Sequence, residues 1–147
     1  MTIDNTVASL RLLGLDVGDR RIGVAISDPM GVIASPVSVY RRTDDRRDAD
    51  HIASLVQELE ASGVVVGLPI NMDGTEGPQA HKTRQFAHVL QQRGLEIRFW
   101  DERLSTMEAT RLLTEQRHTR RKVRSRVDMT AAALILQSYL DRVRTIR

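Results

Sequence analysis

The sequence predicts an α/β fold in which helices are layered on a single mixed sheet. Residues 12–40 show three short strand patterns separated by turn residues, which predicts three antiparallel strands in succession. Residues 44–143 then alternate segments of helical and strand-like hydrophobic spacing. Right-handed crossovers would set the fourth strand parallel to the first and beside it. The carboxyl ends of these two strands would flank a crevice, where ligands usually bind in such sheets.

The first two strands form a hairpin, LLGLDVGDRRIGVAISD over residues 12–28, folded about Gly18-Asp19. A two-residue turn sets Val17 opposite Ile22 and Asp16 opposite Gly23. The bulky face then comprises Leu13, Leu15, Val17, Ile22, Val24 and Ile26. The other face comprises Gly14, Asp16, Gly18, Gly23, Ala25 and Ser27, and is broken only by Arg21 near the turn. Small residues let another backbone or a ligand approach closely. Because a carboxylate in an apolar strand is costly without a partner, Asp16 is a candidate functional residue.

The next elements follow from spacing and turn residues. A third strand is expected over 32–40, and Pro36 places it at an edge of the sheet. A helix should begin near Asp44 and stop at Gly63, because its apolar residues have helical spacing. The continuous apolar run over 64–68 is typical of a strand that is buried on both faces.

A glycine-rich polar loop over 69–78 leads into a second helix that ends at Gly94. The inward residues of this helix are expected to be Ala80, Thr83, Phe86, Ala87 and Leu90. A strand over 95–100 runs directly into Asp101-Glu102. Ser105 and Glu108 fit a capping box for a third helix that continues to residue 113. A basic loop then precedes a last helix over 127–143.

The 147 residues are expected to form one domain over 11–147 after a flexible tail over 1–10. Without cysteine the chain has neither a disulfide nor a cysteine zinc site, which suits a reducing compartment. The longest near-apolar run, residues 129–136, is too short to cross a bilayer. We therefore expect a soluble cytoplasmic protein without membrane contact, and the sequence leaves its oligomeric state open.

Two charged segments differ in their ratio of basic to acidic residues. Residues 117–126 contain five Arg and one Lys without an acid, whereas residues 41–50 contain four Arg and four Asp and cancel. A block of one sign contacts polyanions or forms a solvated loop. Because only 3% of the residues are aromatic, recognition by base stacking is poorly supported. Contact with phosphates is the expectation.

Three acids could meet in the folded chain. The last helix would carry Asp128 on the same face as Ala131 and Ala132. Small alanines let that helix sit on the glycine-lined face of the hairpin, which would bring Asp128 toward Asp16. Glu102, at the end of a strand, could complete the group from the side.

Three carboxylates at close range raise one another's pKa unless a cation is present. Ligands that are all oxygen favour Mg²⁺ or Mn²⁺ over zinc. Two such ions about 3.5–4 Å apart can activate a water and stabilise the leaving oxygen in phosphodiester hydrolysis. The basic segment over 117–126 would hold a nucleic acid backbone over that site.

Each acid also has a purely structural interpretation. Asp128 could cap its helix together with Ser125, and Glu102 could simply pair with Arg98 or Arg103. Asp73 and Asp101 are expected as loop acids, although either could assist. The residues to which no chemistry is assigned are Asp19, in a turn, and His51, His81, His88 and His118, which lack metal-like spacing.

Four motifs in order resemble the YqgF family, also called RuvX, of pre-16S rRNA nucleases or Holliday-junction-resolvase-like proteins. They are LGLDVGDRRIGVAISD, VVVGLPINMDGTEGPQA, WDERLSTMEA and VDMTAAALILQSYL, which together cover nearly the whole chain beyond the tail. The resemblance implies a ribonuclease H-like fold, with a mixed five-stranded sheet and helices on both faces. It also implies Asp16, Glu102 and Asp128 as catalytic and metal-binding residues, the three that packing and charge suggest.

The resemblance further implies that the loop after the fourth strand, from Gly67 onward, lines the site. Where the family often has lysines before the last aspartate, this chain has arginines, whose bidentate grip on phosphate differs. The residues expected to contact substrate are Gly18, Arg20, Arg21, Asn71, Gly74, Arg120, Arg121, Lys122, Arg124 and Arg126.

Family resemblance implies a metal-dependent endonuclease that acts on the 5′ end of pre-16S rRNA, with ribosomal precursor particles as partners, or a resolvase of branched DNA. The residues do not decide between these substrates. Two further hypotheses stay open. DVGDRRIGVAIS is also similar to the phosphate-binding hairpin of actin-like ATP-binding phosphotransferases, which use two such domains. A non-catalytic ribosome-assembly factor could bind RNA through residues 117–126.

Overall fold

The computed structural model describes residues 11–105 and 120–146, with side chains at 11–105 and 131–144. Over these residues the strands are β2 (Leu12–Val17), β3 (Arg21–Ser27), β4 (Ala34–Arg41), β5 (Gly63–Leu68) and β6 (Ile97–Asp101). The long helices among the described residues are α1 (Asp45–Glu58), α2 (Pro78–Gln92) and α4 (Arg120–Ile146). The predicted tail over 1–10 lies outside the described residues and stays a prediction.

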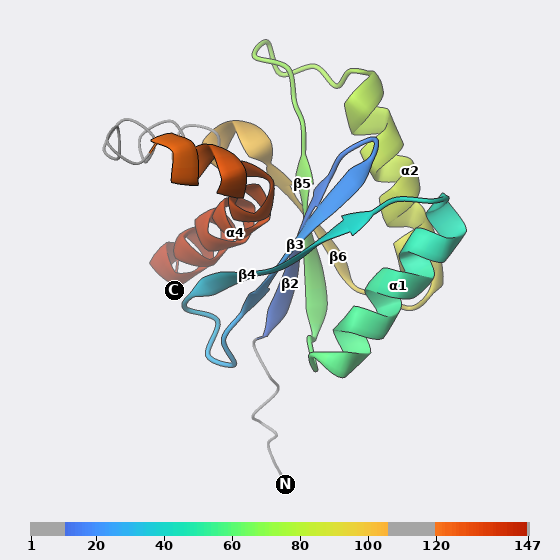
Figure 1. The fold of residues 1–147 in the computed structure, drawn as a ribbon, viewed down its shortest axis with the longest axis horizontal. Helices are drawn as coiled ribbons and strands as arrows, with labels where there is room; N and C mark the ends of the chain where they lie inside the picture. The colour runs from blue at the N-terminus through green and yellow to red at the C-terminus, as the bar shows by residue number, and fades with distance from the viewer. Residues whose placement is uncertain (1–10, 106–119, 147) are drawn as a thin grey trace, which may run out of the picture.

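One five-stranded sheet has the order β4-β3-β2-β5-β6. The first three strands pair antiparallel, whereas β5 pairs parallel with both β2 and β6. Helix α4 covers one face of the sheet, and α1 and α2 cover the other (Figure 1). This is the predicted mixed sheet with helices on both faces, including the parallel neighbours β2 and β5. In the described part of the chain, no helix is long and apolar enough to span a membrane.

The hairpin of β2 and β3 has the predicted register, with Asp16 opposite Gly23. Its tip differs from the prediction by one residue. The amide of Gly18 donates to the carbonyl of Arg21 at 2.8 Å, so Gly18 still belongs to the paired part of the hairpin. The two residues of the turn are therefore Asp19 and Arg20, and the predicted turn at Gly18-Asp19 is wrong.

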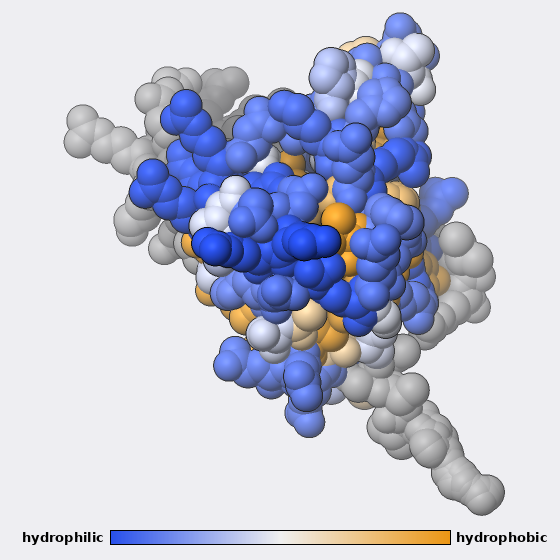
Figure 2. Space-filling model, turned by 90° about the vertical axis from the view of Figure 1, so that its right-hand side faces the viewer, coloured by the Kyte–Doolittle hydropathy of each residue, from blue (hydrophilic) through white to orange (hydrophobic). Residues whose placement is uncertain are grey.

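The bulky face of the hairpin packs on α1 and α2 in the larger apolar core. Phe86 and Leu90 of α2 and Ile52 of α1 are fully buried there against β2, β3 and β5. All five residues predicted to point inward from α2 are buried. From the side of α1 and α2 the surface is mostly hydrophilic, and apolar residues are visible only in seams between segments (Figure 2).

Helix α1 begins as predicted but ends earlier. The side chain of Asp44 accepts a hydrogen bond from the amide of Arg47, which is the usual geometry of an N-cap. The helix ends at Glu58, because the chain leaves helical geometry at Glu60, whose φ is +56°. The predicted end at Gly63 is wrong, since Gly63 already begins β5.

The other face of the hairpin supports α4 at close range. A Cβ placed on Gly14 would lie 2.7 Å from the Cβ of Leu136 and 3.2 Å from the carbonyl oxygen of Ala132. Ala132 and Leu136 are fully buried in a second, smaller core with Ala25 of β3. The structure confirms that the glycine and alanine face lets this helix dock directly on the sheet.

The start of α4 corrects one prediction. The helix begins at Arg120 and not at Val127, so residues 120–126 are helical where a basic loop was expected. Arginine and lysine are good helix formers, and neither glycine nor proline occurs between residues 117 and 146. Ser125 therefore lies inside the helix and is not its N-cap, which removes the capping interpretation of Asp128.

Helical geometry also begins earlier than expected after β6. Residues 102–105 are already helical, so Ser105 is not the residue before the first turn. The Ser105 hydroxyl donates to the carbonyl oxygen of Glu102 at 3.3 Å. Glu108 and the rest of the predicted third helix lie outside the described residues.

Candidate functional site

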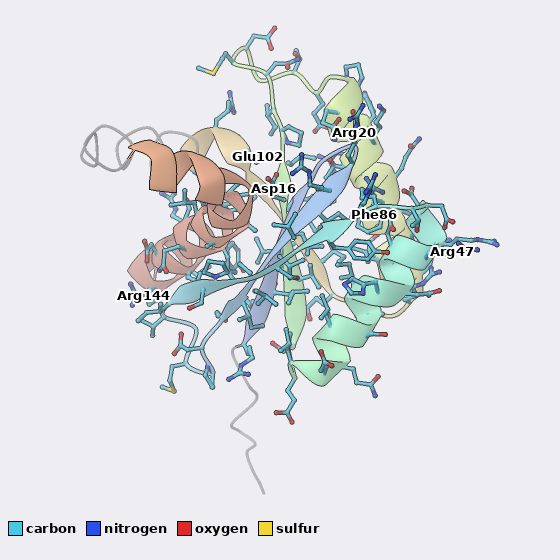
Figure 3. All side chains as sticks on the ribbon, viewed as in Figure 1. Asp16, Arg20, Arg47, Phe86, Glu102 and Arg144 are labelled. Atoms are coloured by element: carbon cyan, nitrogen blue, oxygen red, sulfur yellow. The ribbon has the colours of Figure 1, made fainter. Side chains whose placement is uncertain are left out.

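Two of the three predicted acids lie side by side at one end of the sheet. Asp16 is near the carboxyl end of β2, and Glu102 directly follows β6. Because β2, β5 and β6 are mutually parallel, their carboxyl ends meet at the same edge of the sheet. Figure 3 shows the two labelled carboxylates close together between the sheet and α4. Both acids thus lie at the edge of the sheet where a ligand site was predicted.

Glycine at position 67 allows Glu102 to lie across β5. A Cβ on Gly67 would be 2.9 Å from the Cγ of Glu102 and 2.6 Å from the Cδ1 of Ile135. A residue larger than glycine would therefore displace either the acid or α4. The sequence contained this signal, because a glycine inside an apolar strand often marks a close approach.

The environment of Glu102 favours its protonated form. Burial, followed by the negative charges of Asp16 and Asp101, raises the pKa of Glu102 to about 7. A carboxyl group at this pKa is poised to change charge near neutral pH. Strongly perturbed acids in clefts are typical of functional sites.

The two arginines that could have paired with Glu102 bind other acids. Arg98 donates to Glu96 at 2.8 Å, and Arg103 donates to both carboxylate oxygens of Asp101 at 2.7–3.1 Å. The guanidinium of Arg103 lowers the pKa of Asp101 below its usual range. The interpretation of Glu102 as a simple ion-pair partner of Arg98 or Arg103 is therefore wrong.

The third acid, Asp128, lies on α4, and its side chain is outside the described residues. Its approximate place follows from the backbone. Gly14 faces Ala132, and Asp128 precedes Ala132 by one helical turn. Gln137, further along α4, accepts from the amide of Ala34 at the far end of the sheet. The earlier part of α4 therefore extends toward the edge with Asp16, as predicted.

Among the described side chains, no group of three acids or histidines could hold a metal ion. The structure brings together Asp16 and Glu102, and the participation of Asp128 stays a prediction. The basic side chains predicted to contact substrate from this helix also lie outside the described residues. They are Arg120, Arg121, Lys122, Arg124 and Arg126.

An open pocket lies beside Asp16 on the hairpin. It is lined by Asp16, Gly18, Arg20, Arg21, Gly23 and Val39. The predicted contact residues of the hairpin thus share one pocket with the acid. Both arginines are exposed, so their guanidinium groups are accessible from solvent.

Three residues from outside the hairpin hold its tip, and the first of them, Arg42, also donates its amide to the carbonyl of Arg20 at 2.9 Å. Arg42 donates to the carbonyl of Gly18 at 3.0 Å, and Gln79 donates to the carbonyl of Val17 at 3.2 Å. Lys82 of α2 lies 3.4 Å from the carboxylate of Asp19. The ion pair with Lys82 agrees with the expectation that Asp19 has a structural position in the turn.

The glycine-rich loop after β5 forms a compact turn. The amide of Asn71 donates to the carbonyl of Thr75 at 2.8 Å, and Gly74 has a φ of +89° that favours glycine. Asp73 accepts from the amide and hydroxyl of Thr75, as expected for a loop acid. The observed roles of Asn71 and Gly74 are structural, and their contact with substrate stays a prediction.

Arg103 connects this loop to the site, a role that the sequence analysis did not identify. Its Nη1 lies 3.4 Å from the carbonyl oxygens of both Asn71 and Met72. The same guanidinium holds Asp101, next to Glu102. One side chain therefore links the loop to the strand end that presents the acid.

The comparison with protein families gives a match to RuvX, described as Holliday junction resolvase, over residues 10–142. The chain belongs to the RuvX family. A relative from Clostridioides difficile named "Putative pre-16S rRNA nuclease" is 44% identical over 132 residues, which is 89% of this chain and 94% of the relative. A relative of the same name from Rhodospirillum centenum is 46% identical over 140 residues, 91% of this chain and 74% of the relative.

Solved structures agree on the fold of this RuvX chain. RuvC of T. thermophilus, in complex with Holliday junction substrate, gives a TM-score of 0.61 at 11% identity, covering 92% of this chain and 96% of RuvC. The fowlpox virus Holliday junction resolvase gives 0.51 at 10% identity, with 90% and 99% covered. The predicted ribonuclease H-like fold is confirmed. Family and named relatives together identify the RuvX chain as a nuclease, an enzyme that hydrolyses phosphodiester bonds.

Proposed function

We propose that this chain is a divalent-metal-dependent endonuclease that processes the 5′ end of pre-16S rRNA in the cytoplasm. The observation that carries the proposal is the convergence of Asp16 and Glu102, where burial and the charge of Asp16 raise the pKa of Glu102 to about 7. The substrate comes from the name of relatives that are 44% and 46% identical. The absence of cysteine suits a reducing cytoplasm, where ribosomal precursor particles would present the RNA.

The donor groups fit Mg²⁺ or Mn²⁺. Asp16 and Glu102 offer only oxygen atoms, and among the described residues no basic side chain forms an ion pair with Glu102. Asp128 is the proposed third ligand, on the backbone register of α4 described above. When bound, such a cation lowers the pKa of a water molecule and neutralises charge on the phosphodiester.

The remaining side chains would position the substrate. Arg20 and Arg21 border the pocket of Asp16, where they can hold a phosphate next to the acids. The first turns of α4 carry five basic residues that would extend this contact along the nucleic acid backbone. Phosphate contacts of this kind orient a structured substrate without reading its bases.

Cleavage assays with a matched pair of variants test the proposal. A pre-16S rRNA leader and a four-way DNA junction are each incubated with Mg²⁺ or Mn²⁺ and wild type, Asp16→Asn or Asp19→Asn. We expect wild type and Asp19→Asn to cut the leader, and Asp16→Asn to lose about a thousandfold or more in rate, equivalent to roughly 4 kcal/mol. Isothermal titration of Mn²⁺ gives a second readout, in which Asp16→Asn binds the ion more weakly.

Other outcomes point to other functions. Cleavage of the junction and not the leader would make branched DNA the substrate, as the description of the family model suggests. Equal cutting by wild type and Asp16→Asn would refute the assigned site. Binding without cutting would favour a ribosome-assembly factor, and calorimetric ATP binding would favour a phosphotransferase.

A further inference from the structure

Two arginines, Arg21 and Arg41, lie opposite each other on the neighbouring strands β3 and β4. The register of β3 and β4 pairs Arg21 directly with Arg41. Both residues are exposed. Like charges directly opposite each other in an antiparallel pair are destabilising. Two exposed like charges on neighbouring strands suit a ligand of opposite sign that contacts both.

Arg41 has no acidic partner among the described residues, whereas its neighbour in sequence does. Arg42 binds Asp45 at 2.6 Å and Asp48 at 2.9 Å, and its guanidinium lies over the ring of Phe86. The sequence alone indicated that the charges of residues 41–50 cancel one another. In the folded chain they do not all do so, because Arg41 is not among the arginines that pair with these aspartates. Arg42 thus forms its ion pairs next to the core, whereas the guanidinium of Arg41 is exposed on the surface.

The alternation of side chains places Arg41 on the face of Asp16. Asp16 pairs with Gly23, and Gly23 pairs with Val39, so these three share one face of the sheet. Arg21 and Arg41 lie two residues from Gly23 and Val39 on the same strands, and therefore point to the same face. Arg42 points to the opposite face, consistent with its contact to Phe86.

Strand geometry gives the distance between this pair and the acids. Val39 is the residue of β4 in register with Asp16, two strands away at about 4.8 Å per strand. Arg41 is two residues further along β4 at about 3.3 Å per residue, so its Cα lies roughly 12 Å from that of Asp16. Arg21 lies between the two positions and lines the pocket of Asp16. Because this distance of roughly 12 Å is well beyond the axial rise of about 3.4 Å per nucleotide, a phosphate bound at this pair would not be the one that is cut, but one a short way along the same strand.

We propose that Arg21 and Arg41 together bind one backbone phosphate of the substrate, a few nucleotides from the bond that is cut. The substrate strand would then run from β2 across β3 to β4 at this edge of the sheet. Two guanidinium groups can each donate bidentate hydrogen bonds to a phosphate and relieve their mutual repulsion. This inference rests on the proposed nuclease function for its substrate but uses residues outside the acid group.

Binding without cleavage tests the inference independently of catalysis. Fluorescence anisotropy of a labelled pre-16S rRNA leader duplex is measured in EDTA over a range of KCl concentrations. We expect Arg41→Gln to bind about five- to tenfold more weakly, with a lower salt slope. The decrease should be smaller than the roughly 0.7–0.9 of one fully lost phosphate contact, because Arg21 still holds the same phosphate. Arg41→Lys should keep the slope and recover part of the affinity, because it retains charge but not the bidentate grip.

Arg46→Gln is the matched control. Arg46 is an exposed arginine of α1, on the other layer of the molecule, and its removal should leave affinity and slope unchanged. The double variant Arg21→Gln/Arg41→Gln should lose less than the product of the two single losses, because both residues serve one phosphate. A neutral methylphosphonate placed in turn at each position a few nucleotides from the cut should, at one position, weaken wild type more than Arg41→Gln, because that variant has already lost part of its contact with the phosphate.

Two further measurements distinguish a loss of phosphate binding from a loss of folding or of catalysis. The melting temperature of Arg41→Gln should equal or exceed that of wild type, because the substitution removes a like-charge pair. Binding of Arg41→Gln within twofold of wild type with an unchanged slope would overturn this inference and leave the nuclease proposal standing. Loss of Asp16 dependence in the cleavage assay would overturn the nuclease proposal and leave the binding result standing.

Discussion

Two carboxylates are withdrawn from water in this protein, and their surroundings are opposite. Asp48 of α1 is fully buried and accepts hydrogen bonds from the Nε of Arg42 and from the amide and hydroxyl of Thr43, at 2.9, 2.9 and 3.1 Å. Burial alone would raise the pKa of Asp48, but these donors and Tyr40 together lower it below its usual range. Glu102 has burial and two like charges, and its pKa rises to about 7.

The difference separates a structural acid from a functional one. A buried charge stabilises a fold only where partners and hydrogen bonds offset the loss of water, and Asp48 meets that condition. Glu102 does not meet it among the described residues, so its ionised form costs stability in the folded chain. Such a cost is expected where a positively charged ligand completes the site.

The largest effect should come from removing the charge of Asp48. Asp48→Asn leaves Arg42, whose side chain is 12% exposed, without its buried partner. We expect a loss of about 3–5 kcal/mol in the free energy of unfolding, measured by urea denaturation. The control Asp45→Asn removes the more exposed partner of Arg42 and should cost less than about 1 kcal/mol. Equal midpoints for Asp48→Asn and wild type would contradict the structural role of Asp48.

Filling the space under Glu102 should come next. Gly67→Ala places a Cβ 2.6 Å from Ile135 and 2.9 Å from Glu102, which should cost about 1–3 kcal/mol and reduce cleavage by displacing the acid. Gly63→Ala, in the same strand, meets its nearest atoms at 3.4 Å and is the control. If the two variants melt at the same temperature, the close approach at Gly67 is not a constraint.

The third prediction is that replacing Glu102 by glutamine stabilises the metal-free protein at high pH. The folded-state pKa of Glu102 is about 7, above its usual 4.5, so the folded chain binds more protons between these values. Stability of the metal-free wild type should therefore fall as pH rises from about 4.5 to 7. Glu102→Gln should be more stable than wild type by about 1–2 kcal/mol at pH 8, and the gain should disappear near pH 4.5.

Thermal melts in EDTA across this pH range measure the effect, with Glu96→Gln as the control for removal of an exposed glutamate. Glu96 pairs with Arg98, and its substitution should produce no gain at pH 8. Destabilisation of the protein by Glu102→Gln at pH 8 would show that Glu102 is satisfied in the way that Asp48 is. Cleavage should fall in Glu102→Gln under all of these conditions.

The smallest expected effect concerns the loop that Arg103 holds. Arg103→Gln removes contacts to the carbonyls of Asn71 and Met72 and the ion pair with Asp101. Because the pair is partly exposed, the global cost should be below about 1 kcal/mol. Hydrogen exchange at the amide of Asn71 should nevertheless accelerate, and the control Arg98→Gln, on the preceding strand β6, should leave it unchanged. Equal protection in both variants would show that the loop holds itself.

The sequence predicted the surroundings of some of these acids better than those of others. The position of Asp16 was predictable to the residue, because the alternation of bulky and small side chains determines both register and face in a hairpin. The burial of Asp48 was not, because residues 41–50 read as a self-cancelling polar segment, and only folding brings Arg42 over Phe86. The proximity of Glu102 to Gly67 depends on pairing between β5 and β6, which is a tertiary property.

The start of α4 shows a second kind of difference. The sequence predicted a basic loop and a helix start at residue 127, and a possible cap at Ser125 and Asp128 agreed with it, but local caps contribute only about 1 kcal/mol. Good helix formers upstream and the docking of Ala132 and Leu136 on Gly14 outweigh that signal, so the helix continues back to Arg120. The docking of this helix on the glycine-lined face was predicted from the sequence, but its effect on where the helix begins was not.

The contacts of Arg42, Gln79 and Lys82 with the hairpin tip have a consequence for affinity. They join the tip to the packed layer of α1 and α2, so its conformational entropy is lost during folding and not when a substrate arrives. A binding surface that is ordered in advance converts more of each phosphate contact into observed affinity. The rigid tip should therefore favour tight binding of substrates whose own shape is already formed, and discriminate against flexible ones that must still be ordered.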